Sequence, residues 1–202
     1  VVEKVEVLGS MRRRAVTVGD VDLAVATKKP DKVMEHLLKY KGIKKILSTG
    51  PKTTMFIHSS GNQVDVKTQE SNAWGSMLQH YTGSKLHNIK LRTFAIAKGM
   101  SLSENGIKHK GRVKRFEDEE SFYNYLGLDY VPPELREDSG EIEAALRHRL
   151  PHLVEEMNLR GDLHIHTNID ISTSHDIGAS SVKELLSRAR ELKYEYIGLS
   201  DH

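Results

Sequence analysis

The stretch GSMRRRAVTVGDVD, residues 9–22, decides the fold of the first part of the chain. It ends in Asp20 and Asp22, which lie at the start of a predicted strand (residues 21–26), where side chains at i and i+2 point to the same face. Two carboxylates held this close repel each other unless a cation neutralises them. Carboxylate oxygens are the ligands that Mg²⁺ prefers. The stretch therefore predicts a metal site at the end of a strand.

The surrounding sequence predicts an α+β unit of about 70 residues, a small sheet with helices on a face. Alternating apolar and polar residues indicate strands at 3–8 and 21–26, and two more strands are expected at 53–58 and 63–66, on either side of a hairpin turn at 59–62. An amphipathic helix is expected to begin at Pro30, with Val33, Met34, Leu37 and Leu38 on one face. Asp65 lies in the last of the strands and would complete a trio of carboxylates.

The other residues of the opening stretch suit a bound phosphate. Gly9 and Gly19 allow the backbone to come close to a ligand, Ser10 offers a hydroxyl, and the arginines at 12 and 13 offer forked donors for phosphate oxygens. Each signal is weak by itself, because a Gly-Ser pair is usually a turn and Asp-x-Asp is usually a surface accident. Their combination with Asp65 indicates a nucleotide site.

From Trp74 onward the pattern becomes helical. Ser84 is expected to cap a helix that ends at Gly99, with an apolar face formed by Leu86, Ile89, Thr93, Ile96 and Ala97. A second helix is expected at 118–126, before Gly127, and a third around 141–150. The breakers at 131–133 and 138–140 predict a boundary between them.

The last part of the sequence predicts a single βαβ unit. Strands are expected at 162–166 and 196–199, and Ser181 with Glu184 forms a capping box for the helix between them. The inward residues of that helix should be Val182, Leu185, Leu186, Ala189 and Leu192. His164 and His166 should face one way and His202 follows the second strand, so the three could bind one transition metal. One such unit cannot close a sheet, so we expect the chain to be a piece of a longer protein.

Composition and charge place few limits on function. The chain has 202 residues, 38% hydrophobic and 29% charged, with a net charge of +2 and no cysteine. These values are ordinary for a folded domain, exclude disulfides, and fit a reducing cytoplasm. No apolar run approaches the roughly 18 residues of a membrane span. Basic residues gather at 12–14 and 85–114, and the acidic runs at 117–120 and 134–143 are expected to be solvated faces.

Taken together, Gly9 to Arg13 and Thr17 to Asp22 resemble the palm of the family X DNA polymerases, within the nucleotidyltransferase superfamily. The resemblance implies that Asp20, Asp22 and Asp65 bind two Mg²⁺ (or Mn²⁺) ions, with Asp65 as base for the primer 3′-hydroxyl. It also implies that Gly9, Ser10, Arg13 and Gly19 contact the triphosphate.

The run from Tyr81 to Ile89, followed by Leu91 and Arg92, resembles the thumb of the same polymerases. By that resemblance Tyr81 and Gly83 pack on the incoming sugar and Asn88 reaches the minor-groove edge of the base. Lys85 and Arg92 are the corresponding DNA contacts. Taken without the resemblance, the same run indicates only a loop and a helix cap.

Asp162 to Thr167 and Ser200 to His202 resemble the first motifs of the polymerase and histidinol phosphatase (PHP) domain, a barrel that follows the thumb in bacterial and archaeal family X polymerases. The resemblance implies that His164, His166 and His202 are a partial site for Zn²⁺ or Mn²⁺. Because the other ligands are missing, and 167–179 departs from the usual sequence, we expect no nuclease activity from this chain.

The sequence thus predicts an α+β fold: a nucleotidyltransferase-type palm at 1–74, an α-rich thumb at 75–137, a linker at 138–160, and a truncated βαβ unit of a PHP barrel at 161–202. We expect a monomeric, cytoplasmic, nucleoid-associated DNA-directed DNA polymerase that fills gaps in DNA repair. Its partners would be gapped or primer-template DNA and a dNTP. DNA binding should be weak, since no finger domain precedes Val1. A nucleotidyltransferase with a non-DNA acceptor, and a binding fragment without turnover, stay open.

Overall fold

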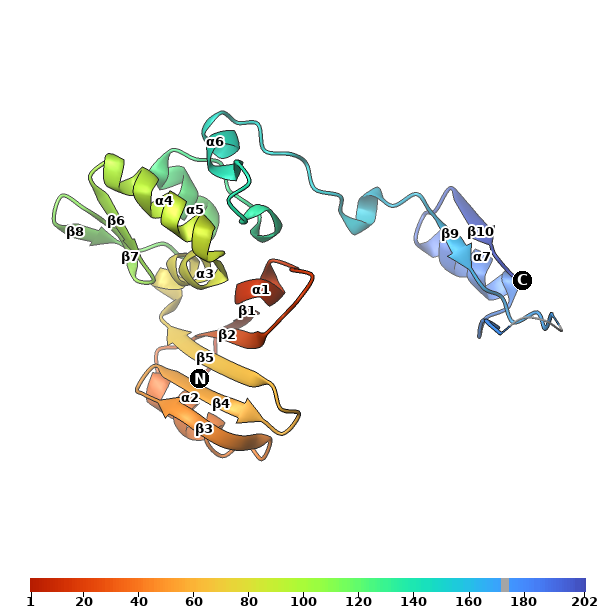
Figure 1. Ribbon diagram of the computed structural model, residues 1–202, viewed down its shortest axis with the longest axis horizontal. Helices are drawn as coiled ribbons and strands as arrows, with labels where there is room; N and C mark the ends of the chain where they lie inside the picture. The colour runs from red at the N-terminus through yellow and green to blue at the C-terminus, as the bar shows by residue number, and fades with distance from the viewer. Residues whose placement is uncertain (172–174) are drawn as a thin grey trace. The chain divides into compact units, whose positions relative to one another are not determined.

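The computed structural model describes residues 1–171 and 175–202. The chain divides into two compact units, residues 1–150 and residues 151–202. The larger unit contains one five-stranded sheet and one three-stranded sheet, and the smaller unit contains a two-stranded sheet (Figure 1). The larger unit contains the residues that were expected to form a palm and a thumb, and it is described first.

The five-stranded sheet has the order β1-β2-β5-β4-β3. Its strands are β1 (Lys4–Val7), β2 (Asp20–Ala26), β3 (Ile43–Thr49), β4 (Thr53–His58) and β5 (Gln63–Gln69). Strands β2 and β5 are parallel, and every other neighbouring pair is antiparallel. The predicted small mixed sheet is therefore confirmed, with four of its strands close to their expected positions.

The two faces of this sheet carry different helices. On one face Val25 and Val66 pack with Phe56 and with Met34 of α2 (Pro30–Leu37). On the other face Ala24 and Ala26 pack with Leu8 and with α3 (Trp74–Thr82), through Trp74, Met77 and Leu78. Because strand side chains alternate, Asp20 and Asp22 share the second face with Ala24. The acidic residues therefore lie on the side of the sheet that faces α3.

Strand β3 is an element that the sequence pattern did not predict. Its sequence, IKKILST, does not alternate, and all of its residues after Ile43 are exposed. It pairs only with β4, at the edge of the sheet, and the register shifts twice along the pair. An edge strand with bulges has no buried face to impose a two-residue period, which explains the missing signal.

Residues 85–150 build a second core. It lies among α4 (Lys85–Ala97), α5 (Glu119–Leu126), α6 (Glu141–Leu146) and a sheet of β6 (Met100–Ser103), β7 (Gly106–His109) and β8 (Arg112–Lys114). Its fully buried members include Leu91, Ile107, Phe122 and Ala145. The predicted thumb is therefore not purely helical, since a three-stranded antiparallel sheet completes it. Helix α6 lies within the interval expected to be a linker, and its Ile142 is buried in this core.

The apolar face predicted for α4 is wrong. Leu86, Ile89 and Ile96 are exposed by 57%, 50% and 68%, whereas the buried residues are His87, Leu91 and Ala95. The true inner face includes a histidine, which a hydrophobicity pattern does not count. The helix bounds themselves are as predicted, with the Ser84 hydroxyl accepting a hydrogen bond from the N–H of His87.

Helix α5 begins and ends where the sequence indicates. The Asp118 carboxylate accepts a hydrogen bond from the N–H of Ser121 at 2.6 Å and caps the first turn. Gly127 ends the helix in the left-handed conformation, with φ of 79°. A short 3-10 turn at Pro133–Leu135 follows, and leads to α6.

The smaller unit is the predicted βαβ arrangement. Strands β9 (Gly161–Ile165) and β10 (Tyr196–Leu199) are parallel, and α7 (Val182–Glu191) connects them (Figure 1). The capping box of Ser181 and Glu184 is present. A 3-10 turn at Glu156–Asn158 precedes β9. The stretch 167–179, where the sequence departs from the family motif, lies partly outside the described residues.

No helix among residues 1–171 and 175–202 is both long enough and apolar enough to cross a lipid bilayer.

Candidate active site

Asp22 and Asp65 are direct neighbours across the parallel pair of β2 and β5. The ammonium of Lys67 lies between them, 2.9 Å from Asp22 Oδ1 and 3.5 Å from Asp65 Oδ2. The Lys67 and Asp22 side chains are only 17% and 22% exposed. The structure therefore brings two of the three predicted carboxylates together, and it places a cation between them.

Gly9 makes room for this pair. It begins the short helix α1 (Gly9–Arg12) with φ of 57°, and a Cβ at this position would lie 2.6 Å from Asp22 Oδ2. The Leu8 N–H donates to the Asp22 carbonyl oxygen at 2.8 Å, which fixes α1 beside β2. Any side chain at Gly9 would push into the carboxylate, so the glycine is required here by both conformation and space.

The third carboxylate, Asp20, is exposed and lies at the first position of β2, where its neighbour on β5 is Gln63. Among the described residues, no three His, Asp or Glu side chains are arranged to hold one metal ion together. The donor set nevertheless suits Mg²⁺ chemically, because it offers only carboxylate oxygens, and Asp22 and Asp65 already share a positive charge. The residue types therefore suit a divalent cation, and Asp20 is the most exposed of the three carboxylates.

Lys67 remains protonated in this position. Burial by itself lowers the pKa of the ammonium, but its bonds to Asp22 and Asp65 outweigh burial and raise the pKa above its ordinary value. The ammonium also lies 5.1 Å from the centre of the Tyr81 ring. Burial, followed by the nearby Glu104 charge, raises the pKa of the Tyr81 hydroxyl, which is therefore uncharged. The predicted sugar-packing residue thus adjoins the carboxylates.

The predicted phosphate contacts occupy α1 and the loop after it. Ser10 follows Gly9 on α1, and a Cβ added to Gly19 would meet no atom within 4 Å. Arg13, in contrast, is already engaged. Its Nε donates to Glu137 Oε1 at 2.6 Å, and its Nη1 donates to the Thr82 carbonyl oxygen at 2.6 Å.

A buried ion-pair cluster joins α1 to the thumb. Glu119 accepts hydrogen bonds from Arg12 and from Arg136, each at 2.6 Å and each through a different carboxylate oxygen. Arg136 is 0% exposed and Glu119 is 4% exposed. Burial alone would raise the pKa of Glu119, but the two guanidinium groups outweigh burial and lower the pKa below its ordinary value. Arg12 also donates to the Thr82 hydroxyl at 2.7 Å.

The turn at residues 82–84 carries the predicted sugar contact Gly83, which has φ of 72°. The peptide bond between Gly83 and Ser84 is cis. The Ser84 N–H donates to the Arg136 carbonyl oxygen at 3.0 Å. Together with the bonds from Arg12 and Arg13 to Thr82, this contact holds the turn from both sides.

Asn88, the predicted base contact, is tied to α3. Its amide nitrogen donates to the His80 carbonyl oxygen at 2.7 Å, and its amide oxygen accepts from Gln79 at 2.8 Å. The predicted DNA contacts Lys85 and Arg92 lie on the exposed side of α4. Arg92 is 3.4 Å from His80 Nδ1. Lys85 and Arg92 are therefore not part of the carboxylate cluster and lie on the solvent-exposed side of α4.

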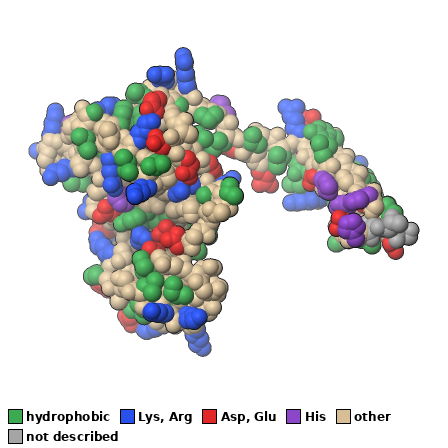
Figure 2. Space-filling view, in the orientation of Figure 1, with side chains coloured by type: hydrophobic (Ala, Val, Ile, Leu, Met, Phe, Trp, Pro, Cys, Tyr) green, Lys and Arg blue, Asp and Glu red, His purple; other side chains and the backbone are tan. Residues whose placement is uncertain are grey.

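The histidines of the smaller unit are partly gathered. His164 and His166 have their Nε2 atoms 3.0 Å apart, and the rings of His166 and His202 are 5.5 Å apart between centroids. Figure 2 shows histidine side chains clustered on this unit. The Asp201 carboxylate accepts from the N–H and the hydroxyl of Thr167 at 2.6 and 2.7 Å, which ties β9 to the end of β10. Imidazole nitrogens suit Zn²⁺ or Mn²⁺ by their chemistry, but these three histidines, all among the described residues, are not arranged around one ion.

Sequence reasoning missed several residues at these sites. Lys67 follows Asp65 by two residues on β5, so a strand extended past residue 66 would have put both side chains on one face and revealed it. Glu137, Glu119 and Arg136 were assigned to solvated charge runs or to no role, and no local signal distinguished them. Their partners lie 124, 107 and 17 residues away in the sequence, and only the fold brings them together.

Comparison with known proteins identifies relatives of the chain. Residues 77–137 match the family described as DNA polymerase beta thumb. The chain is also similar to DNA polymerase/3′-5′ exonuclease PolX of Bacillus subtilis (strain 168), with 36% identity over 198 residues. That alignment covers 96% of this chain and 33% of the relative. The chain thus spans about a third of the length of the protein that it matches.

Proposed function

We propose, from the similarity of its residues 77–137 to the DNA polymerase beta thumb and of 96% of its length to a bacterial PolX, that the chain belongs to the family X DNA polymerases and that its larger unit carries the nucleotidyl-transferring site of a DNA-directed DNA polymerase. It would add dNMP from a dNTP to a primer 3′-hydroxyl during gap-filling repair synthesis. The palm would be residues 1–74 and the thumb residues 75–137, with 138–160 leading to the smaller unit.

One observation carries this proposal. Asp22 and Asp65 are register neighbours on parallel strands, and both bind the Lys67 ammonium. Two carboxylates that share a cation, next to helix α1, which begins with Gly9, form a site for a positively charged ligand. A purely structural salt bridge would not also require the left-handed Gly9 against Asp22. This combination supports a metal-dependent reaction on a phosphate substrate.

Asp20, Asp22 and Asp65 are the residues that would hold two Mg²⁺ or Mn²⁺ ions. When bound, such ions would neutralise the triphosphate and lower the pKa of the attacking hydroxyl. Asp65 is the carboxylate proposed to accept the proton of the primer 3′-hydroxyl. Lys67 reduces the repulsion between Asp22 and Asp65, and it would give up its bonds to them as the substrate complex forms.

The nucleotide would lie between α1 and the 82–84 turn. Gly9, Ser10, Gly19 and Arg13 would bind its phosphates through backbone and side-chain donors. Tyr81 and Gly83 would pack on its sugar and leave little space for a 2′-hydroxyl. Asn88 would exchange its present bonds to α3 for the minor-groove edge of the base, where donors test pair geometry without reading sequence.

The DNA would follow the exposed side of α4. Lys85 and Arg92 present exposed cations there, and such residues bind the phosphate backbone in a salt-dependent manner. For the smaller unit we propose a correspondence to the first βαβ unit of a PHP domain. His164, His166 and His202 would form part of a Zn²⁺ or Mn²⁺ site there.

The test of this function is template dependence. A duplex with a one-nucleotide gap is offered with each dNTP separately, in Mg²⁺, for each of the four templating bases. The proposal predicts extension only by the complementary nucleotide. Extension of RNA or of an unpaired strand, without regard to template, would instead establish a nucleotidyltransferase with another acceptor. Binding of dNTP and DNA without extension would establish a fragment that lacks turnover.

A further inference from the structure

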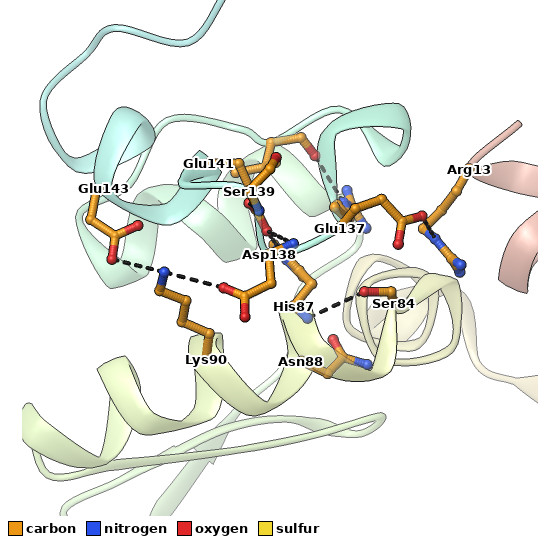
Figure 3. A network of polar contacts seen from close by, with 12 residues as sticks. Arg13, Ser84, His87, Asn88, Lys90, Glu137, Asp138, Ser139, Glu141 and Glu143 are labelled. Atoms are coloured by element: carbon orange, nitrogen blue, oxygen red, sulfur yellow. Dashed lines mark hydrogen bonds and ion pairs between the residues drawn. The ribbon is translucent and has the colours of Figure 1, made fainter. Parts of the chain in front are cut away.

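The acidic run at residues 134–143, here called the acidic segment, is exposed at Glu137, Asp138 and Glu143, yet it is not a row of unpaired charges. Each of its acids is paired with a base of the palm or thumb. The pairs are Glu134 with Arg14 at 3.3 Å, Glu137 with Arg13 at 2.6 Å, Asp138 with Lys90 at 3.1 Å, Glu141 with His87 at 2.6 Å, and Glu143 with Lys90 at 3.0 Å. Figure 3 shows the pairs made by Glu137, Asp138, Glu141 and Glu143, with Glu137 directed toward Arg13 and Lys90 between Asp138 and Glu143. The acidic segment is therefore an ordered part of the unit.

Glu141 anchors the acidic segment to α4. Its carboxylate, in a residue only 4% exposed, accepts hydrogen bonds from the N–H groups of Asp138 and Ser139 at 3.0 and 2.8 Å and pairs with His87. The other ring nitrogen of His87 lies 2.8 Å from the Tyr123 hydroxyl. These bonds fix the turn that immediately follows Glu137.

The residue before Glu137 is fixed as well. The Arg136 side chain is buried against Glu119, and its carbonyl oxygen accepts from the Ser84 N–H. Glu137 therefore extends from a backbone that is held on both sides. Its carboxylate contacts the Arg13 guanidinium, which is 13% exposed, whereas the Glu137 side chain is 47% exposed.

This contact matters because of the position of Arg13. Arg13 follows Gly9 and Ser10 by a few residues, in the segment proposed above to bind the triphosphate. A triphosphate carries several negative charges, and Glu137 carries another at 2.6 Å from the same guanidinium. Like charges at one cation repel, so the two anions cannot both bind Arg13 without cost.

We propose that Glu137 is a residue of the nucleotide site, an internal anion that holds Arg13 when no dNTP is bound and that the triphosphate displaces. The strength of the Arg13–Glu137 pair then sets the affinity for dNTP. The inference rests on the proposed function, because it assumes a triphosphate near Arg13. It assigns a role to a side chain that lies 124 residues from its partner.

The test compares Glu137→Gln with the wild type. Glutamine keeps the shape and one acceptor oxygen but removes the charge. Binding of dNTP and of inorganic tripolyphosphate is measured by calorimetric titration in Mg²⁺. Glu137→Gln should bind both ligands about three- to tenfold more tightly, the range expected when a partly exposed ion pair is removed as a competitor. The matched control is Glu134→Gln, whose partner Arg14 is 80% exposed, and it should leave both affinities unchanged.

A double mutant separates competition from a general structural change. In an Arg13→Ala background, Glu137→Gln should no longer alter either affinity, because its partner is gone. Unchanged or weaker binding by Glu137→Gln, while the wild type binds dNTP, would overturn the inference and leave the proposed function standing. If neither the wild type nor any variant bound dNTP, the proposed function would fail, and the role of Glu137 with it.

Discussion

The strongest test of the packing described here is Glu119→Gln. Glu119 uses one carboxylate oxygen for Arg12 and the other for Arg136, each at 2.6 Å. Glutamine has a single acceptor, so one guanidinium would face an amide N–H₂ instead. Since Arg136 is 0% exposed, its charge would be left buried without a full partner. Breaking a buried pair in this way costs about 3–5 kcal/mol of the free energy of unfolding.

The measurement is urea unfolding of the chain at pH 7, followed by a spectroscopic signal from Trp74, which packs in the palm core. Glu120→Gln is the control, because Glu120 is the exposed neighbour on the same helix. Its effect should stay within about 0.5 kcal/mol. A loss below about 1 kcal/mol for Glu119→Gln would refute the argument that the cluster holds the palm and thumb together.

The same cluster makes stability dependent on pH. The pKa of Glu119 is lower in the folded chain, because Arg136 and Arg12 outweigh its burial. A carboxyl group with a lowered folded pKa contributes its full stabilisation above the unfolded value, about 4.3. That contribution is lost as the pH falls through the folded pKa. The difference in unfolding free energy between wild type and Glu119→Gln should therefore shrink as the pH falls below about 4.

Two further predictions concern His87 and Lys67. Burial lowers the pKa of His87 despite its bond to Glu141. The stabilisation from the neutral imidazole should therefore be lost as the pH falls below the pKa of an unfolded histidine, about 6.5. An NMR titration should find a lower pKa for His87 in the folded chain than in urea, and an equal or higher folded pKa would contradict this. Lys67→Met should leave two carboxylates without their shared cation and cost about 1–3 kcal/mol in metal-free buffer, as measured by urea unfolding. Mg²⁺ should restore part of that loss by binding the folded state, and a loss that Mg²⁺ leaves unchanged would argue against a shared cation site.

The fold was predictable where the sequence is locally consistent. Strand β4 was predicted with its observed bounds because the turn residues at 59–62 mark its end. The cap at Ser84 and the capping box at Ser181 are signals carried by residues three apart, so they require no knowledge of the rest of the chain. Edge strand β3 gave no such signal, since its residues after Ile43 are exposed.

The inner face of α4 shows why pattern alone failed elsewhere. His87 is buried because Glu141 and Tyr123, 54 and 36 residues away, complete its hydrogen bonds. A polar residue with distant partners can replace an apolar one in the core, and local hydrophobicity does not reveal it. Leu86 and Ile89 were therefore assigned to the core although they are exposed.

The candidate site likewise contains residues that local motifs predicted and residues whose partners are distant in the sequence. The pairing of Asp22 with Asp65 follows from two short motifs on strands, and the structure brings these residues together. The partners of Arg12 and Arg13 could not be predicted, because Glu119 and Glu137 reach them only through the folded thumb. The residues expected to contact substrate came from motifs, and the residues that hold them in place came from the structure.

The central claim is that the carboxylates on β2 and β5 perform template-directed nucleotidyl transfer. The most direct measurement is incorporation of the complementary dNTP into a one-nucleotide gap in Mg²⁺, by wild type, Asp65→Ala and Asp31→Ala. Asp31 is an exposed carboxylate in the first turn of α2. We predict extension by the wild type and by Asp31→Ala, and its loss in Asp65→Ala while the folded state persists. Template-matched extension by Asp65→Ala at the wild-type rate would contradict the assignment.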